Sequence, residues 1–435
     1  MRGEADTIFA IASGSGRAAV TLLRISGPRT GELLAQLAGQ LPQPRLAALR
    51  TLQDSCGERL DHALVLWFPA PASYTGEDCG ELHLHGGQAV IQGVAEALTG
   101  LGARPAEAGE FTRRAFLNGK MDLIAAEAVA DLIEAETSAQ RRQALDQLEG
   151  ALGDQYRGWT ARLTRLLAWQ EALIDFPDED LPPDVDAALT AEMTALRGEI
   201  AAHLDDGRRG ERLREGLVFA IAGPPNVGKS TLINALADRE VAIVSPTPGT
   251  TRDVLEVRVV FGSVPVTLLD TAGLRETDDP VEAEGVRRAR ARLAGADLWI
   301  DVRDATSLAD GEANLVAREA RLVVANKADL GASGGVSDCR VSALTGAGLA
   351  ELRDRLADEA RRLTQRRGPP PLTRTRHRAA LVAALDRLEQ AQIAPLAELR
   401  GEDLRGALYE LGRITGQVDA EAVLDAVFAQ FCIGK

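Results

Sequence analysis

The strongest chemical signal in the sequence is the segment GPPNVGKS, from Gly223 to Ser230. It fits the pattern G-x-x-x-x-G-K-[ST] and lies between an apolar, strand-like run and a helix-forming one. In this pattern backbone N–H groups surround phosphate, Lys229 reaches the β- and γ-phosphates, and the hydroxyl of Ser230 supplies an oxygen to Mg²⁺. The segment therefore predicts a site for a nucleoside triphosphate and magnesium.

Four further motifs follow in order: GTTRD (249–253), DTAG (270–273), NKAD (326–329) and SALTG (342–346). They offer a threonine hydroxyl for the metal, an aspartate for Mg²⁺ and a purine pocket. Asp329 would accept hydrogen bonds from guanine N1–H and its 2-amino group, which selects GTP over ATP, and Lys327 would pack its stem beside the base. The five motifs resemble the GTPases of the TRAFAC class, which include Ras. The predicted GTP contacts are Asn226, Val227, Gly228, Lys229, Ser230, Thr231, Ser245, Pro246, Thr247, Pro248, Gly249, Thr250, Thr251, Asp270, Thr271, Ala272, Gly273, Asn326, Lys327, Asp329, Ser342, Ala343 and Leu344.

The hydrolytic group is less easily assigned. Leu274 follows DTAG, where Ras-type enzymes carry a glutamine that orients water, so another group must serve. Glu282 is the acidic candidate, although four other acids lie in the same segment: Glu276, Asp278, Asp279 and Glu284. For the charge that builds up, Asn226 and oxygens of the loop SPTPGTT could hold a monovalent cation. An arginine finger from Arg252 or Arg275 is the rival explanation. A third explanation is that these side chains form only structural salt bridges.

These motifs require a sheet whose strand ends meet. Residues 215–365 alternate β-rich runs with helical segments, which predicts an inserted α/β P-loop domain with a mostly parallel sheet. Residues 1–119 carry short strand-like runs among Gly and Pro, which predicts an α+β domain. Residues 120–214 have helical spacing that returns after a linker within 366–435, so both flanks are predicted to form one all-α domain.

Charge and composition set limits on the function. A net charge of -15 and a pI of about 5.0 argue against coating nucleic acid by bulk charge. The stretch from Arg361 to Arg378 has seven arginines, no acids and a triple proline, and a solvated connector is favoured there over an RNA contact. Four scattered cysteines and the lack of an apolar run near ~20 residues predict a cytoplasmic protein without a membrane span.

Only four of the 49 basic residues are lysines: Lys120, Lys229, Lys327 and Lys435. The nucleotide motifs explain two of them. Lys120 follows a turn-like Asn-Gly pair and matches no phosphate loop. Strand alternation places Glu81, His83 and His85 on one face, where they could form a metal triad, but a strand with one polar face is the favoured explanation.

Seven features together resemble the MnmE (TrmE) family of tRNA-modification GTPases: DTIFA, LLRISGP, YTGED, HGG, GEFTRRAFLNGKMDL, the GTPase motifs and the terminal FCIGK. The resemblance spans essentially the whole chain. It implies an N-terminal domain that binds folate and dimerises the protein, a helical domain built from both flanks, and an inserted G domain. The implied boundaries are 1–119, 120–214, 215–365 and 366–435.

The resemblance also implies an activity. With a flavoprotein, MnmG or GidA, in a heterotetramer, such a protein adds a carboxymethylaminomethyl-type group to carbon five of the wobble uridine of certain tRNAs. It would use a tetrahydrofolate derivative in the 5-formyl or methylene form, while GTP hydrolysis drives a conformational cycle. The implied site residues are Arg24, Glu81, Lys120 and Lys435 for folate; Asn226, Ser245, Thr247 and Thr250 for K⁺; Ser230 and Thr251 for Mg²⁺; and Glu282 as the catalytic acid.

The chain departs from the family pattern at the potassium loop, where Ser245 replaces a frequent threonine and prolines occupy positions 246 and 248. Cys432 lies in the terminal motif, but a lone cysteine between apolar neighbours is more often buried or inert than nucleophilic. Two other functions stay open: a ribosome-assembly GTPase, which would normally carry an RNA-binding module after the G domain, and a mechanical switch without substrate chemistry.

Overall fold

The structure is a computed structural model that describes residues 6–14, 16–175, 185–237, 256–271, 293–307, 321–331, 335–365 and 368–418, and also 424, 425, 427–429, 431 and 434. The chain divides into two units. The first comprises Met1–Ala130, Leu148–Thr164 and Leu408–Lys435, and the second comprises Asp131–Gln147 and Arg165–Ala407. Residues from the end of the chain therefore belong to the same unit as its beginning.

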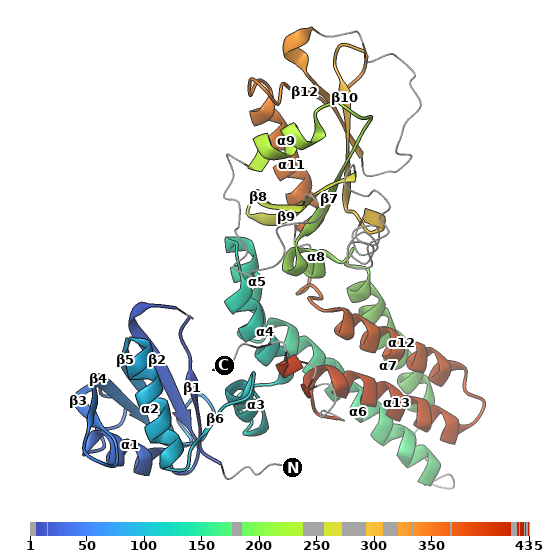
Figure 1. Cartoon of the computed structure of the whole chain (residues 1–435). Helices are drawn as coiled ribbons and strands as arrows, with labels where there is room; N and C mark the ends of the chain where they lie inside the picture. Colours follow the sequence, from blue (N-terminus) through green and yellow to red (C-terminus); the bar gives the residue numbers. More distant parts are fainter. Residues whose placement is uncertain are drawn as a thin grey trace, which may run out of the picture. The chain divides into compact units, whose positions relative to one another are not determined.

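The first unit contains a six-stranded sheet in the order β3-β4-β5-β2-β1-β6 (Figure 1). All neighbouring strands are antiparallel except β1 and β6. Helices α1 and α2 cover one face, because apolar side chains alternate along the strands and pack under these helices, among them Leu23, Val65 and Leu82. The elements are β1 Ile8–Ile11, β2 Ala18–Ser26, α1 Thr30–Ala38, β3 Ala48–Gln53, β4 Arg59–Phe68, β5 Cys79–Gly86, α2 Gln88–Gly100 and β6 Arg104–Pro105.

A second apolar core of this unit joins helices to the last residues of the chain. Phe428 and Phe431, whose ring centroids are 5.5 Å apart, pack with Leu123 and Phe116. The helices around this core are α3 Glu110–Leu117 and α4 Leu123–Glu134, and α6 Ala151–Asp175 begins in the same unit. Phe428 and Phe431 are thus held against these helices by burial of their aromatic side chains.

The second unit contains the predicted α/β domain, whose six-stranded sheet has the order β12-β11-β10-β7-β9-β8 (Figure 1). All pairs are parallel except β8 with β9. Helices α9 and α11 bury Leu232, Leu352 and Leu356 against one face. The elements are β7 Leu217–Ala222, α9 Lys229–Ala237, β8 Glu256–Phe261, β9 Val264–Asp270, β10 Leu298–Asp304, β11 Arg321–Asn326, β12 Cys339–Arg340 and α11 Leu349–Thr364. The predicted fold class is therefore confirmed.

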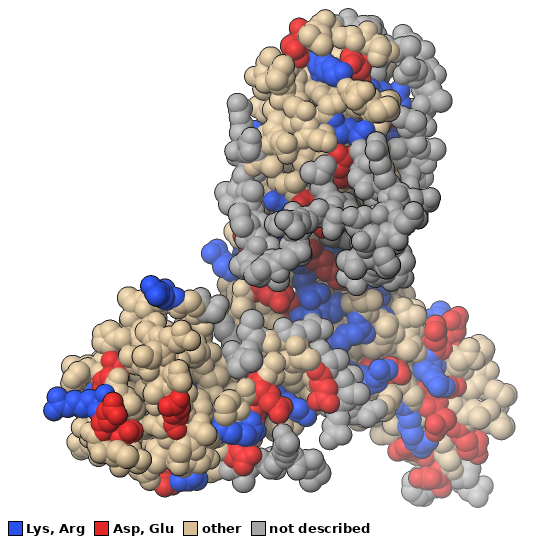
Figure 2. Space-filling model, viewed as in Figure 1, with Lys and Arg blue, Asp and Glu red and all other residues tan. Residues whose placement is uncertain are grey.

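The helical elements on either side of this domain are α5 Ser138–Leu148, α7 Val185–Leu204, α8 Arg209–Glu215, α12 Thr375–Ile393 and α13 Ala397–Thr415. Helix α12 packs against α7. Acidic and basic side chains are interspersed on the helical surface drawn in Figure 2. Among the helices that the structure describes, none combines the length and apolar character that crossing a bilayer requires.

The arginine-rich connector differs from its prediction. Arg378 donates hydrogen bonds to Leu204 O at 2.8 Å, Asp206 Oδ1 at 2.6 Å and Glu211 Oε1 at 3.1 Å. Arg374 is 9% exposed and pairs with Asp131 at 2.7 Å. The expectation of a solvated connector is wrong for these two arginines, because acids from distant segments neutralise them where the chain returns to the helices.

Candidate functional site

The phosphate-binding segment connects strand β7 to helix α9, in the strand–loop–helix context that the sequence predicts. The Nζ atom of Lys229 donates hydrogen bonds of 2.9 Å to the carbonyl oxygens of Gly223 and Pro224. A Cβ atom on Gly223 would lie 2.1 Å from the carbonyl oxygen of Val302, so this loop passes β10 only because glycine occupies the position. The lysine ammonium is thereby held at the start of a helix, where unpaired N–H groups attract phosphate.

Two of the oxygen groups expected near magnesium meet beside this loop. The hydroxyl of Ser230 donates a hydrogen bond of 3.0 Å to Oδ2 of Asp270, which ends strand β9 and is 1% exposed. The hydroxyl of Thr271, the next residue, donates to Ile221 O at 3.0 Å and so ties the start of the DTAG motif to β7. Hydroxyl and carboxylate oxygens are the donors that Mg²⁺ prefers, so Ser230 and Asp270 fit this ion.

Asn326 links the phosphate loop to the predicted base-binding motif. Its Nδ2 donates to Val227 O at 2.9 Å, and its Oδ1 accepts from the backbone N–H of Ala343 at 3.0 Å. The residue is 2% exposed, and a Cβ atom on Gly228 would lie 2.5 Å from its Nδ2 atom. One buried amide thus brings the GPPNVGKS, NKAD and SALTG segments together at the carboxyl ends of parallel strands, where α/β sheets bind ligands.

The side chains expected around the base lie beyond Asn326. Lys327 has a left-handed backbone, with φ of 63°, and Asp329 and Leu344 are exposed. The Nζ atom of Lys327 lies 2.8 Å from Oδ2 of Asp304, a residue that the sequence reasoning missed. Asp304 ends β10 as Asp270 ends β9, so its place at a strand end was a usable signal.

Several predicted residues lie outside the described part of the chain, and their interactions stay predictions. They are the switch-loop and metal residues Ser245, Pro246, Thr247, Pro248, Gly249, Thr250 and Thr251, then Ala272 and Gly273, the catalytic candidate Glu282, its rivals Glu276, Asp278, Asp279 and Glu284, the finger candidates Arg252 and Arg275, and Cys432 and Lys435.

In the first unit, two of the predicted folate residues form an ion pair on neighbouring strands. Arg24 of β2 lies directly opposite Glu81 of β5, and their side chains meet at 3.0 Å. The guanidinium of Arg24 lies 5.1 Å from the ring centroid of Tyr74 and 5.8 Å from that of Phe111. Burial raises the pKa of the Tyr74 phenol, while its hydrogen bond with Thr112 opposes the shift. The Arg24 guanidinium therefore lies over two aromatic rings. Phe111 is fully buried, whereas the partly exposed ring of Tyr74 could also contact a flat heterocycle.

The turn that carries Lys120 adjoins the YTGED segment. The Nζ atom of Lys120 donates to Pro71 O at 3.1 Å, and Asn118 Nδ2 donates to Thr75 O at 2.8 Å. A Cβ atom on Gly76 would lie 3.3 Å from the Cγ atom of Lys120, so the glycine leaves room for the lysine stem. The YTGED segment and the turn that carries Lys120 thus lie side by side near Tyr74.

The end of the chain reaches the same sheet. A Cβ atom on Gly434 would lie 1.9 Å from Ile11 O, so Gly434 rests directly on strand β1. Ala10 of that strand is paired with Arg24 of β2. Gly434 is therefore held on β1, the strand next to the one that carries the predicted folate arginine.

The metal triad considered for Glu81, His83 and His85 does not form among the described residues. In the part of the chain that the structure describes, no group of three His, Cys, Asp or Glu side chains could hold a metal. Glu81 is paired with Arg24, and His85 Nδ1 lies 2.7 Å from Asp61 Oδ1. The favoured explanation, a strand with one polar face, is the one that agrees with this geometry.

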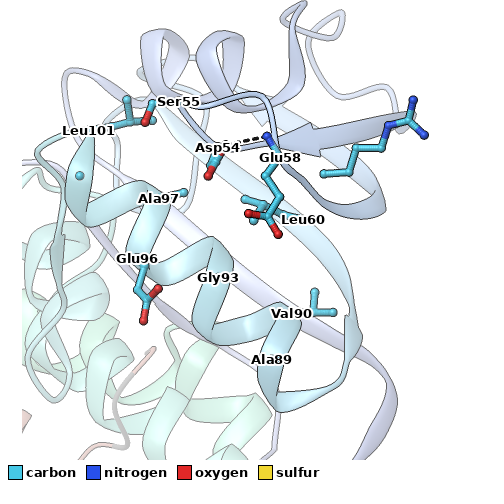
Figure 3. Close-up of a pocket in the computed structure, with 12 residues that line it drawn as sticks. Asp54, Ser55, Glu58, Leu60, Ala89, Val90, Gly93, Glu96, Ala97 and Leu101 are labelled. Atoms are coloured by element: carbon cyan, nitrogen blue, oxygen red, sulfur yellow. Dashed lines mark hydrogen bonds between the residues drawn. The ribbon is translucent and has the colours of Figure 1, made fainter.

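A separate cavity of about 480 Å³ lies between the β3–β4 turn and helix α2 (Figure 3). Asp54, Glu58 and Glu96 contribute carboxylates, and Leu60 and Val90 contribute apolar surface. The Oδ1 atom of Asp54 accepts from the backbone N–H of Glu58 at 2.8 Å, which stabilises the turn. None of its lining residues is a predicted folate contact, so this cavity is distinct from the Arg24–Glu81 pair.

Comparison with known proteins gives matches along nearly the whole chain. The family model described as MnmE helical domain matches residues 123–432, and that described as GTP-binding protein TrmE N-terminus matches residues 7–120. The tRNA modification GTPase MnmE of Granulibacter bethesdensis is 56% identical over 437 residues, covering 99% of both chains. The proteins of that name from Gluconacetobacter diazotrophicus and Rhodospirillum rubrum are 57% and 54% identical, covering 100% and 99% of both chains. The chain therefore belongs to the MnmE family of tRNA modification GTPases.

Proposed function

We propose that this GTPase acts in the cytoplasm with a flavoprotein of the MnmG (GidA) type to modify carbon five of the wobble uridine of certain tRNAs. The product is a carboxymethylaminomethyl-type group whose extra carbon comes from a tetrahydrofolate derivative. The observation that carries the proposal is the Asn326 network, which joins phosphate-binding and guanine-selecting segments in a chain of this family.

The nucleotide half of the function follows from the residues around the phosphate loop. Lys229 holds a positive charge at the β- and γ-phosphates, and loop N–H groups bind phosphate oxygens. Ser230 and Asp270, with Thr251, hold Mg²⁺, which neutralises charge on the phosphates when bound. Asp329 selects guanine, and Glu282 orients the attacking water. Hydrolysis then drives a change of conformation and supplies no carbon chemistry.

The charge of the transition state is compensated by potassium in this proposal. Asn226 is exposed and has a left-handed backbone, with φ of 65°, so its side-chain carbonyl is available beside the phosphates. Ser245, Thr247 and Thr250 complete the ion's oxygen ligands. Equal GTP turnover in sodium and potassium buffers of the same ionic strength would refute potassium and favour the arginine finger.

The folate half rests on charged residues of both signs. Glu81 can accept hydrogen bonds from the N–H groups of a reduced pterin, while Arg24 and Tyr74 offer cationic and aromatic surface. Lys120 and the terminal Lys435 supply ammonium groups for a ring carbonyl or the anionic glutamate tail. We place the 5-formyl or methylene derivative there.

A second copy of the chain is the partner proposed for the open face of the N-terminal sheet. Leu49 and Leu64 are directly paired on β3 and β4 and are 65% and 41% exposed, and Val20 of β2 is 58% exposed. Apolar side chains gathered on one sheet face, away from α1 and α2, favour burial against a partner. Homodimerisation predicts that Leu49→Lys with Leu64→Lys yields a monomer in light scattering, whereas an unchanged dimer would exclude this face.

The function as a whole is tested by mass spectrometry of wobble uridines from cells that lack this chain. The expected result is loss of the carboxymethylaminomethyl-type group and its restoration by the intact gene. Unchanged uridines would favour the two alternatives, a ribosome-assembly GTPase or a mechanical switch.

A further inference from the structure

Asp304 is bonded on both carboxylate oxygens at the edge of the guanine site. Its Oδ2 accepts from Lys327 Nζ at 2.8 Å. Its Oδ1 accepts from the backbone N–H of Thr306 at 3.0 Å and from the Thr306 hydroxyl at 2.7 Å. The carboxylate is therefore fixed by its own loop before it meets the lysine.

The backbone holds Asp304 and Lys327 in register. Asp304 is the parallel partner of Asn326 on β11, and Ala305 N donates to Asn326 O at 2.7 Å. Because Asn326 is itself bonded to Val227 and Ala343, Asp304 belongs to the same rigid edge as the phosphate loop. A carboxylate on this edge is a fixed anchor rather than a mobile surface charge.

A lysine side chain can form one side of a binding site only if its position is fixed, and a bound carboxylate can fix it. Its four rotatable bonds carry about 1.5–2 kcal/mol of rotamer entropy, which is lost if the stem becomes ordered only when the base binds. Lys327 is partly exposed, with 33% of its side chain accessible, and so is not ordered by burial alone. The ion pair orders the stem in advance, which reduces the entropy lost on binding.

The carboxylate of Asp304 is ionised at neutral pH. The hydrogen bond from Lys327, followed by those from Thr306, lowers the pKa of Asp304 to about 2. The carboxylate is therefore ionised from mildly acidic to basic pH, and protonation does not switch the anchor.

We propose that Asp304 is a positioning residue for guanine, which holds the Lys327 ammonium so that the lysine stem is already placed along the plane of the base. The inference rests on the guanine-nucleotide site proposed above. The competing explanation is an ordinary ion pair that only stabilises the domain. The two explanations predict different nucleotide affinities for an Asp304 variant, because loss of a purely stabilising ion pair leaves the affinity of the folded protein unchanged.

The experiment measures the affinity of the full chain for a fluorescent GDP analogue and GTP turnover at saturation. Asp304→Asn should weaken binding about fivefold, as expected for loss of a partly exposed ion pair, while kcat stays within about twofold. Asp304→Glu should recover most of the affinity. The matched control is Asp358→Asn, which neutralises an aspartate on α11 that pairs with Arg361, and it should bind as tightly as wild type.

A double-mutant cycle with Lys327→Met makes the test specific. Methionine keeps an apolar stem without the ammonium, so adding Asp304→Asn to this variant should change affinity by less than about twofold. An equal loss in both backgrounds would overturn the inference, as would a fall in kcat with unchanged affinity. A variant Asp304→Asn that unfolds without nucleotide while Asp358→Asn does not would show a fold-stabilising role and overturn it as well.

The same binding measurement separates an error in the proposed guanine site from an error in the role of Asp304. A wild-type chain that does not bind the GDP analogue would overturn the guanine site and the role of Asp304 together. Normal binding by wild type and equal binding by Asp304→Asn would overturn the role of Asp304 alone.

Discussion

The nucleotide site and the proposed folate site are built in different ways. At the first, contiguous motifs follow the ends of parallel strands, and the buried amide of Asn326 links them. At the second, Arg24 of β2 and Glu81 of β5 are placed opposite each other by the register of the sheet, and the proposed lysines come from segments far away in the sequence. The motifs of the first site can therefore be recognised as short segments of the sequence, whereas the residues of the second come together only in the tertiary structure.

The two sites also differ in their charge balance. The Lys229 ammonium donates to two backbone carbonyl oxygens, which carry no net charge, so its positive charge is available to phosphate. The Arg24 guanidinium is already compensated by Glu81 at 3.0 Å. A polyanion suits the first site, and a largely neutral heterocycle that carries hydrogen-bond donors suits the second.

The largest effect is expected from Lys229→Ala. Loss of the ammonium at the transferring phosphate should reduce GTP turnover by about 100-fold or more. Binding of 5-formyltetrahydrofolate should stay within about twofold, because the residue belongs to the other site. Turnover is measured by phosphate release and folate binding by equilibrium dialysis. A parallel loss of folate binding would show that the sites are not independent.

A smaller but still large effect is expected from Arg24→Ala. It leaves Glu81, whose side chain is 20% exposed, without its ionic partner and removes a cation from the ligand surface. Folate affinity should fall about 30-fold, whereas GTP turnover should be unchanged. A matched control is Arg29→Ala, which removes an exposed arginine of the same domain that pairs with Glu32. Full folate affinity in Arg24→Ala would contradict the assignment.

The smallest of the three effects is expected from Gly434→Ala. The added Cβ would lie 1.9 Å from Ile11 O at a φ of 101°, so residue 434 must move away from β1. Folate affinity should fall about tenfold because Lys435 is displaced, with GTP turnover intact. Gly39→Ala is the control, since it has a φ of 74° and no atom within 4 Å of the added Cβ. Equal effects of the two variants would remove the chain end from the site.

In the part of the chain that the structure describes, the nucleotide-binding motifs lie at the strand ends where the sequence suggested, because these motifs are short and continuous. Lys229, Ser230 and Asp270 could be placed from spacing alone, since the carboxyl ends of parallel strands meet at one edge. Asp304 was not predicted as a site residue, because an aspartate at the end of a strand has many explanations until its ion pair with Lys327 is seen.

The rest of the molecule was less predictable for a physical reason. Arg24 and Glu81 are 57 residues apart in sequence, and no local pattern says that β2 and β5 pair in this register. Only the resemblance to the family assigned these two residues to a common site. The arginines of the connector were misjudged in the same way, because Asp131, Asp206 and Glu211 lie far from them in sequence.

One measurement tests the central claim that the chain carries two independent ligand sites. Equilibrium dialysis of the wild-type chain, Lys229→Ala and Arg24→Ala against a GDP analogue and 5-formyltetrahydrofolate gives both affinities from the same samples. The account predicts that wild type binds both ligands, that Lys229→Ala loses only the nucleotide, and that Arg24→Ala loses only the folate. A wild-type chain that does not bind folate, or a single substitution that abolishes both ligands, would contradict it.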